Sequence, residues 1–406
     1  IDGDRIFCET GAEFWFVAEG SAAKANELTA TYPPLIRELS VGDHVMLADG
    51  TVSMVVEEHL RDRVRLSVVQ RGDIRSRQGI NLPGVKLSAP AISVEDHKHA
   101  LWAAEAGVDF VSLSFVRAPD EVRALRDILR SSNSDAAVVS KIEKREALDR
   151  LEEVVAASDA VMVARGDLGV EIDVAQMPVE QKRIITTCHR YQKPAIIATQ
   201  MLDSMHDSLR PKRAEVTDVA NAVIDGADAC MLSGETAIGQ YPLETVQMMN
   251  RICMATEQSL AHRPPKTGDV ASDAVLHDVT RAVVRGAGEM AYTLGAKLVI
   301  VSSYTGRTAL GLSQQRSFVP TVGVSSDEKT LRKMSLYWGV TPLAEAPAED
   351  MTNLVLHTDK WACETGLARK GDRIIIVGGS HLAAGGSKEM ASGVHDVVLV
   401  HQVEGA

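Results

Sequence analysis

Charged side chains follow short apolar segments in the middle of this sequence. Arg165, Gly166 and Asp167 come directly after one such segment, and Lys141 and Glu143 close another. Since Lys141 and Glu143 are two residues apart, both side chains project to the same side of an extended chain. Two carboxylates, Glu143 and Asp167, with no cysteine or histidine beside them, are oxygen ligands of the kind that Mg²⁺ or Mn²⁺ prefers. A lysine beside such a metal favours an anionic substrate, either phosphorylated or enolate-forming.

Two further residues fit the same chemistry. Gly166 would let a substrate approach the backbone closely, and N–H groups at this turn can bind a carboxylate. Thr199 closes a fourth apolar segment in the same way. Each feature alone has a structural explanation, because Lys141 and Glu143 can form an ion pair and Thr199 can be an ordinary core hydroxyl. The repetition of polar residues at successive segment ends favours a functional site.

The segments that carry these residues alternate with amphipathic stretches. The five segments are continuously apolar, which is typical of parallel strands covered on both faces. They span 109–116, 136–143, 160–167, 194–201 and 229–236. Between them, 120–129 and 145–155 place apolar residues on one helical face. This βα alternation predicts a TIM-type barrel or a doubly wound sheet, in which the carboxyl ends of all strands meet on one face.

The regions on either side have a different character. Residues 1–82 read as all-β, with a hairpin turn at Asp49-Gly50. A polar linker containing proline spans 262–269, and 270–406 show a second α/β pattern. We therefore expect three domains, at 1–82, 83–262 and 270–406.

Composition narrows the possible partners. The chain has 406 residues and a net charge of -12, which gives no help to binding nucleic acid or an anionic membrane. No apolar run approaches the ~18 residues of a membrane span. The five cysteines show no CxxC spacing, and the first residues do not resemble a signal peptide. Free thiols in a reducing cytoplasm are expected.

Several of these stretches closely resemble the pyruvate kinase family. They include "INLPG", "SKIEKREAL", "VMVARGDLGVEI", "IIATQMLDSM" and "RAEVTDVANAVIDGADACMLSGETAIGQYP". The resemblance implies an α/β fold: a (β/α)₈ TIM-type barrel, an inserted β-barrel lid and a C-terminal α/β domain for regulation and oligomerisation, usually as a homotetramer. It implies phosphoryl transfer from phosphoenolpyruvate to ADP, giving pyruvate and ATP, in glycolysis.

The resemblance also implies residue roles. Glu143 and Asp167 would bind Mg²⁺ or Mn²⁺, and Lys141 would stabilise the transferring phosphoryl group and the enolate. Backbone groups of Gly166 and Asp167, with Thr199, would hold the substrate carboxylate. Thr199 would also join the proton relay to the enol.

The sequence departs from the family pattern in several places. The family has three barrel strands before its lid, whereas this sequence begins at the lid, so the barrel is incomplete here. The family's phosphate-binding arginine and K⁺ ligands lie in that earlier part, and a K⁺ requirement is only possible. Gln78 stands where the family often has lysine, and Leu209 and Lys212 replace the usual proline and threonine. With five strands instead of eight, we expect residues 1–406 alone to be poorly soluble or inactive.

A possible effector site follows an apolar strand in the C-terminal region. Its hydroxyls, its glycine turn and the start of a helix would suit a phosphate group. Its residues are Ser302, Ser303, Thr305, Gly306, Arg307 and Thr308. An ordinary capped loop explains the same residues.

Two other functions remain open from the sequence. A Mg²⁺-dependent barrel aldolase acting on pyruvate enolate uses similar carboxylates, but generally without this lid and C-terminal domain. A catalytically impaired regulatory paralogue would keep the fold, but would not need Lys141, Glu143, Asp167 and Thr199 together.

Overall fold

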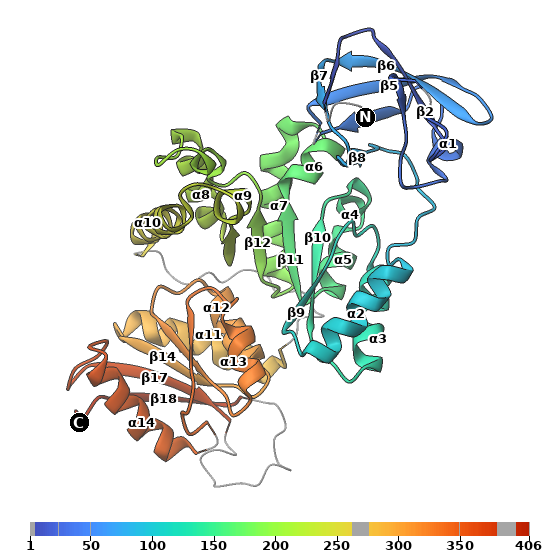
Figure 1. Ribbon diagram of the computed structural model, residues 1–406. Helices are drawn as coiled ribbons and strands as arrows, with labels where there is room; N and C mark the ends of the chain where they lie inside the picture. The colour runs from blue at the N-terminus through green and yellow to red at the C-terminus, as the bar shows by residue number, and fades with distance from the viewer. Residues whose placement is uncertain are drawn as a thin grey trace.

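Three parts follow one another along the chain in the computed structural model (Figure 1). The structure describes residues 5–22, 24–48, 50–261, 276–348, 350–379 and 395–405. The predicted linker at 262–269 and most of the glycine-rich loop after Gly378 lie outside these residues. No helix among the described residues is long and apolar enough to cross a membrane.

The N-terminal part is built from antiparallel strands and one helical turn. Six strands form a sheet in the order β3-β2-β6-β5-β4-β8, and β1 pairs with β7. Alternate residues of β6, namely Val64, Leu66 and Val68, are buried, as expected of a sheet with one face in a core. The elements are β1 (Ile6–Cys8), β2 (Glu13–Val17), β3 (Glu27–Leu28), α1 (Leu35–Glu38), β4 (His44–Leu47), β5 (Val52–His59), β6 (Arg63–Gln70), β7 (Gly72–Ile74) and β8 (Ile80–Asn81).

The hairpin predicted at Asp49-Gly50 connects β4 and β5, which pair antiparallel. Gly50 has φ +80°, which suits a turn glycine, and Asp49 lies outside the described residues. A side chain at Gly50 would meet Val170 of the middle part at 3.4 Å. The tip of this hairpin therefore lies against the segment that carries Gly166 and Asp167.

The middle part contains the five predicted parallel strands. They are β9 (Phe110–Leu113), β10 (Ala137–Ile142), β11 (Ala160–Ala164), β12 (Ala195–Ala198) and β13 (Ala229–Met231), and they pair in the order β13-β12-β11-β10-β9. Helices cover the outer face, where Val138, Ile142 and Val163 are fully buried. On the inner face, Val139 and Met162 pack together with Leu336 from the C-terminal part. The described residues thus form an unbroken row of five parallel strands whose carboxyl ends lie on one edge.

The helices of the middle part follow their strands. They are α2 (Val94–Ala106), α3 (Pro119–Ser131), α4 (Arg145–Asp149), α5 (Leu151–Ala157), α6 (Arg165–Glu171), α7 (Met177–Arg190), α8 (Arg213–Asp225), α9 (Gly234–Ala237) and α10 (Pro242–Leu260), with 3₁₀ turns at η1 (Val174–Gln176) and η2 (Asp203–His206).

Two local expectations in this part are wrong. The helix predicted over 145–155 is broken at Arg150, whose backbone leaves the helical region, and both pieces still bury their apolar residues. The Arg-Gly-Asp step does not end a strand either. β11 ends at Ala164, and Arg165 starts α6, because the chain must turn there to bury Leu168 completely.

The C-terminal part is a second α/β unit. Its sheet has the order β16-β15-β14-β17-β18, in which only the edge strand β18 is antiparallel. Strand β16, which contains Pro342, was not predicted as a strand. The elements are α11 (Asp278–Thr293), β14 (Leu298–Ser302), α12 (Arg307–Gln314), β15 (Thr321–Val324), α13 (Glu328–Met334), β16 (Val340–Leu343), α14 (Met351–Glu364), β17 (Arg373–Gly378) and β18 (Val397–Gln402).

Arg316 joins the C-terminal part to the middle part. Its guanidinium donates to the carbonyl oxygen of Gly226 at 2.6 Å and to Oδ1 of Asp228 at 3.0 Å, directly before β13. It also lies 5.2 Å from the ring centroid of Trp338. Arg316 has φ +51°, a backbone conformation that costs free energy for any residue with a side chain. This contact is strong enough to hold that conformation.

Candidate functional site

The ion pair between Lys141 and Glu143 lies at the carboxyl end of β10. Lys141 Nζ is 2.6 Å from Glu143 Oε1, and it also donates to Ser114 Oγ at 3.1 Å. The Glu143 side chain is fully buried, whereas 26% of the Lys141 side chain is exposed. The lysine can therefore reach a ligand, while the carboxylate is held in place beneath it.

The backbone after β9 fixes the other oxygen of Glu143. The Phe115 amide donates to Glu143 Oε2 at 2.6 Å. Phe115 has φ +54°, so this residue stores backbone strain next to the ion pair. The sequence gave no sign of this contact, because a left-handed phenylalanine has no recognisable pattern.

Thr199 and Gly166 meet after β12 and β11. The Gly166 amide donates to Thr199 Oγ1 at 2.8 Å. Arg165 donates to the Thr199 carbonyl oxygen at 2.7 Å and pairs with Asp218 at 2.7 Å. Thr199 has φ +69°, which is an outlier for a β-branched residue. The hydroxyl is thus held in one position, and the Gly166 amide, expected to be open to substrate, is engaged by it.

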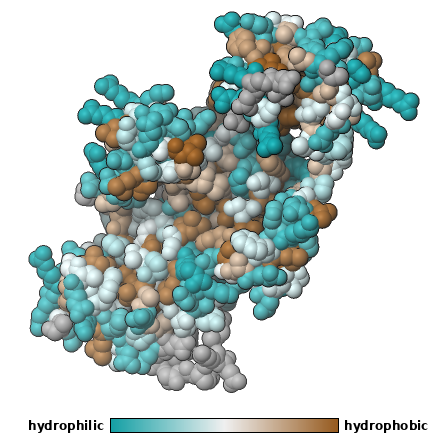
Figure 2. Space-filling view, viewed as in Figure 1, coloured by the Kyte–Doolittle hydropathy of each residue, from teal (hydrophilic) through white to brown (hydrophobic). Residues whose placement is uncertain are grey.

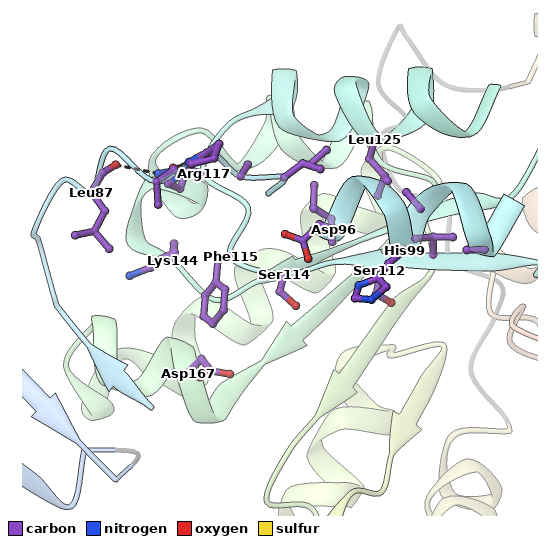
Figure 3. A pocket seen from close by; sticks show the side chains of 18 of the residues that line it. Leu87, Asp96, His99, Ser112, Ser114, Phe115, Arg117, Leu125, Lys144 and Asp167 are labelled. Carbon is purple, nitrogen blue, oxygen red and sulfur yellow. Dashed lines mark hydrogen bonds between the residues drawn. The ribbon is translucent and has the colours of Figure 1, made fainter. Parts of the chain in front are cut away.

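Asp167 faces a large cavity on this side of the sheet. The cavity has a volume of about 930 Å³ and is bordered by β9, α2 and the first turn of α6. Figure 3 shows Ser114, Phe115, Lys144 and Asp167 around the same space. Hydrophobic residues gather over the middle of the molecular face drawn in Figure 2, whereas hydrophilic residues cover much of the N-terminal part.

Lys144 is a cation of this cavity that sequence reasoning missed. It pairs with Glu171 of α6, whose side chain is almost completely buried. Burial raises the pKa of Glu171 despite the opposing effect of Lys144. The pair connects the loop after β10 to α6, and so links the segments of Glu143 and Asp167.

The donor set suits a hard divalent cation. Glu143 Oε1 is buried and accepts no hydrogen bond of good geometry from the described residues, although Lys141 lies beside it. Asp167 follows the neighbouring strand, since β10 and β11 pair directly. The described residues contain no cluster of three or more histidine, cysteine or acidic side chains. One or two carboxylates completed by water and substrate oxygens is the arrangement typical of Mg²⁺.

The residues of the predicted effector loop lie together after β14. Gly306 has φ +77° and precedes α12, which starts at Arg307, one residue earlier than expected. Ser302 donates to the carbonyl oxygen of Ala348 at 2.7 Å, while the buried Ser303 hydroxyl has no partner among the described residues. Thr305 and Arg307 are exposed.

His395 is an addition to this loop that the sequence did not indicate. Its Nδ1 lies 2.9 Å from Thr308 Oγ1, and its Nε2 lies 2.6 Å from the Ser302 carbonyl oxygen.

Taken together, a curled parallel βα sheet with lysine, carboxylates and a strained threonine at its carboxyl edge defines a class of α/β proteins with barrel-type sites. The family model "Pyruvate kinase, barrel domain" matches residues 1–246, and "Pyruvate kinase, alpha/beta domain" matches 281–392. The chain belongs to the pyruvate kinase family. The predicted resemblance and fold class are thereby confirmed.

Individual relatives agree with the family models. Pyruvate kinase of Bacillus licheniformis is 37% identical over 363 residues, which are 89% of this chain and 62% of the relative. Pyruvate kinase of Mycobacterium intracellulare is 36% identical over 391 residues, or 94% of this chain and 81% of the relative. One from Staphylococcus epidermidis is 35% identical, and the chain covers 66% of it. The chain thus spans about two thirds or less of several relatives' length.

Proposed function

We propose that this protein transfers the phosphoryl group of phosphoenolpyruvate to ADP, giving pyruvate and ATP. The observation that carries the proposal is the buried Glu143 carboxylate beneath a partly exposed Lys141 at the carboxyl end of β10. Phosphoryl transfer needs positioning and charge neutralisation more than covalent catalysis, and these two groups supply both. The names of the relatives support the same reaction.

Each residue has a defined task in this reaction. Glu143 and Asp167 would hold Mg²⁺ or Mn²⁺, which when bound would neutralise charge on the phosphate oxygens. The Lys141 ammonium faces the negative charge that develops on the transferring group and the enolate. Ser114 and Glu143 keep its long side chain at the strand end.

Thr199 handles the proton at the enol. Its hydroxyl accepts from the Gly166 amide, so its own proton points away from that amide and toward a neighbouring acceptor. Backbone groups of Gly166 and Asp167 would bind the substrate carboxylate together with this hydroxyl. The positive φ of Thr199 fixes this hydroxyl before substrate arrives, which lowers the cost of ordering it.

Further properties of the family extend the proposal. The protein would act in the cytoplasm as a homo-oligomer, a tetramer by resemblance, with K⁺ as a possible activator. An anionic effector would bind at Ser302, Ser303, Thr305, Gly306, Arg307 and Thr308. The unpartnered buried hydroxyl of Ser303 supports that site.

Titration with metal tests the proposal. In the full-length protein, pyruvate formation from phosphoenolpyruvate should require both ADP and a divalent cation. Asp167→Asn should raise the Mg²⁺ concentration needed for half-activation by about tenfold or more, because one of two anionic ligands is lost. Asp173→Asn is a matched control, since Asp173 caps the 3₁₀ turn after α6 and does not line the cavity. Identical metal titration curves for Asp167→Asn and the unmodified protein would contradict the assignment.

A further inference from the structure

Two cysteines meet on the outer face of the sheet edge. Cys230 lies in β13, and its side chain packs into the layer between strands and helices, whereas the next residue, Met231, faces the opposite side. Cys253 lies in α10 and packs against the same layer. Both are partly exposed, unlike Cys8 and Cys188, which are buried.

The two thiols are in direct contact. Cys230 donates its S–H proton to the Cys253 sulfur, and this hydrogen bond, with burial, raises the pKa of Cys230. Accepting that proton lowers the pKa of Cys253, although burial and Glu257 oppose the effect. Cys253 is therefore the better nucleophile and Cys230 the protonated partner next to it. An attacking thiolate beside a second thiol is the arrangement of redox-active cysteine pairs.

We propose that Cys230 and Cys253 form a reversible disulfide when the protein meets a peroxide. The Cys253 sulfur attacks one peroxide oxygen, the O–O bond breaks, and the products are a sulfenic acid and, after uptake of a proton, water. The Cys230 sulfur then attacks the Cys253 sulfur, the S–O bond breaks and a second water leaves. Overall, two thiols lose two electrons and two protons to one hydrogen peroxide, which becomes two waters.

This bond changes the position of β13 relative to α10. Two sulfurs in van der Waals contact must approach to about 2.0 Å in a disulfide, with the Cβ atoms about 3.8 Å apart. β13 is the edge strand of the described sheet and has three residues, so it can shift more readily than β10 or β11.

The shift would reach the candidate active site through one ion pair. Arg165 and Asp218 both act electrostatically on Cys230, so they border the thiol pair. Arg165 also holds the Thr199 carbonyl oxygen at 2.7 Å. Moving β13 or α10 would therefore disturb the positioning of Thr199. This effect on turnover rests on the proposed function, while disulfide formation does not.

Peptide mapping tests the disulfide by itself. Full-length protein is treated with a series of hydrogen peroxide concentrations, its remaining thiols are alkylated, and it is digested with trypsin without reduction. Cys230 and Cys253 fall on separate peptides, 214–251 and 252–266, because Arg251 lies between them. We expect these peptides joined, with the loss of two hydrogen atoms, and separated again by dithiothreitol.

Matched variants identify the pair. Cys253→Ala and Cys230→Ala should abolish the joined peptide, whereas Cys363→Ala should leave it, since Cys363 is also partly exposed but lies in α14. The proposal is overturned if both thiols stay alkylatable at peroxide concentrations that already oxidise Cys363. It is also overturned if each becomes a sulfinic acid on a separate peptide.

Turnover gives the second readout. Peroxide should lower the rate of pyruvate formation on the order of tenfold, reversibly, in the unmodified protein and in Cys363→Ala, but not in Cys253→Ala. A joined peptide with unchanged turnover would refute the link to Thr199. Failure of the proposed function would look different, because the reduced protein would then show no turnover at all.

Discussion

Replacing Arg316 with methionine tests how the C-terminal part is fixed to the sheet. The guanidinium is 6% exposed and pairs with a fully buried Asp228. Methionine keeps much of the side-chain volume beside Trp338 but removes the charge and the donors to Gly226 and Asp228. The Asp228 carboxylate would remain buried, accepting only from the Ala195 amide and from Gln314.

The magnitude follows from that geometry. Removing one partner of a buried ion pair typically costs about 3–5 kcal/mol. Asp228 keeps two hydrogen bonds, so the lower end, about 3 kcal/mol, applies to opening of this interface. That corresponds to a roughly 100-fold increase in the open population.

Arg332→Met is the matched control. Arg332 also joins the C-terminal part to the middle part, through Asp109 at 2.8 Å, but these side chains are 42% and 23% exposed. An exposed pair contributes about 0–1 kcal/mol, which is at most a few-fold change in opening.

Native-state hydrogen exchange of the full-length protein measures both effects. In Arg316→Met, amides at the start of β12 and β13 should exchange up to about 100-fold faster, and in Arg332→Met only a few-fold faster. Equal acceleration in the two variants, or none in Arg316→Met, would refute the conclusion that buried charge pairing holds this interface.

Two further predictions concern a hydroxyl and a helix cap. Thr199→Val should lower kcat by about 10²-fold with little change in KM, whereas Thr199→Ser keeps the oxygen that accepts from Gly166 and should retain most activity; equal losses in steady-state assays would contradict the hydroxyl's role. Asp96 caps α2, and hydrogen bonds from Ser93 lower its pKa, so its stabilisation is present at neutral pH and lost as pH falls through its folded-state pKa, below 3.8. Asp96→Ala should therefore cost about 1 kcal/mol at pH 7 in urea unfolding and progressively less below about pH 4, and a difference independent of pH would contradict this.

Sequence patterns predicted the sheet well because its signals are local and repeated. The five apolar segments became β9 to β13 in chain order, since continuous burial on both faces demands apolar residues at every position. Turning points were harder to predict. The Arg-Gly-Asp step begins a helix instead of ending a strand because the burial of Leu168, a tertiary effect, decides the local backbone.

The candidate site was predictable in its residue types but not in its contacts. Lys141 and Glu143 were placed together by strand periodicity alone, and the structure pairs them. The contacts of Phe115 and Arg165 join segments 28 and 34 residues apart, and no spacing rule reports such separations. Positive φ at Thr199 is likewise imposed by the surrounding fold, since the sequence favours extended backbone there.

Lys141 is the residue on which the proposed reaction depends most directly. The decisive measurement is the steady-state kinetics of Lys141→Met in the full-length protein, together with its urea unfolding curve. If the ammonium stabilises transition-state charge, kcat for pyruvate formation should fall by about 10²–10⁴-fold, with KM for phosphoenolpyruvate and the unfolding midpoint little changed. If the ion pair with Glu143 only supports the fold, stability will fall and the kcat of the folded fraction will remain near that of the unmodified protein, which would contradict the account.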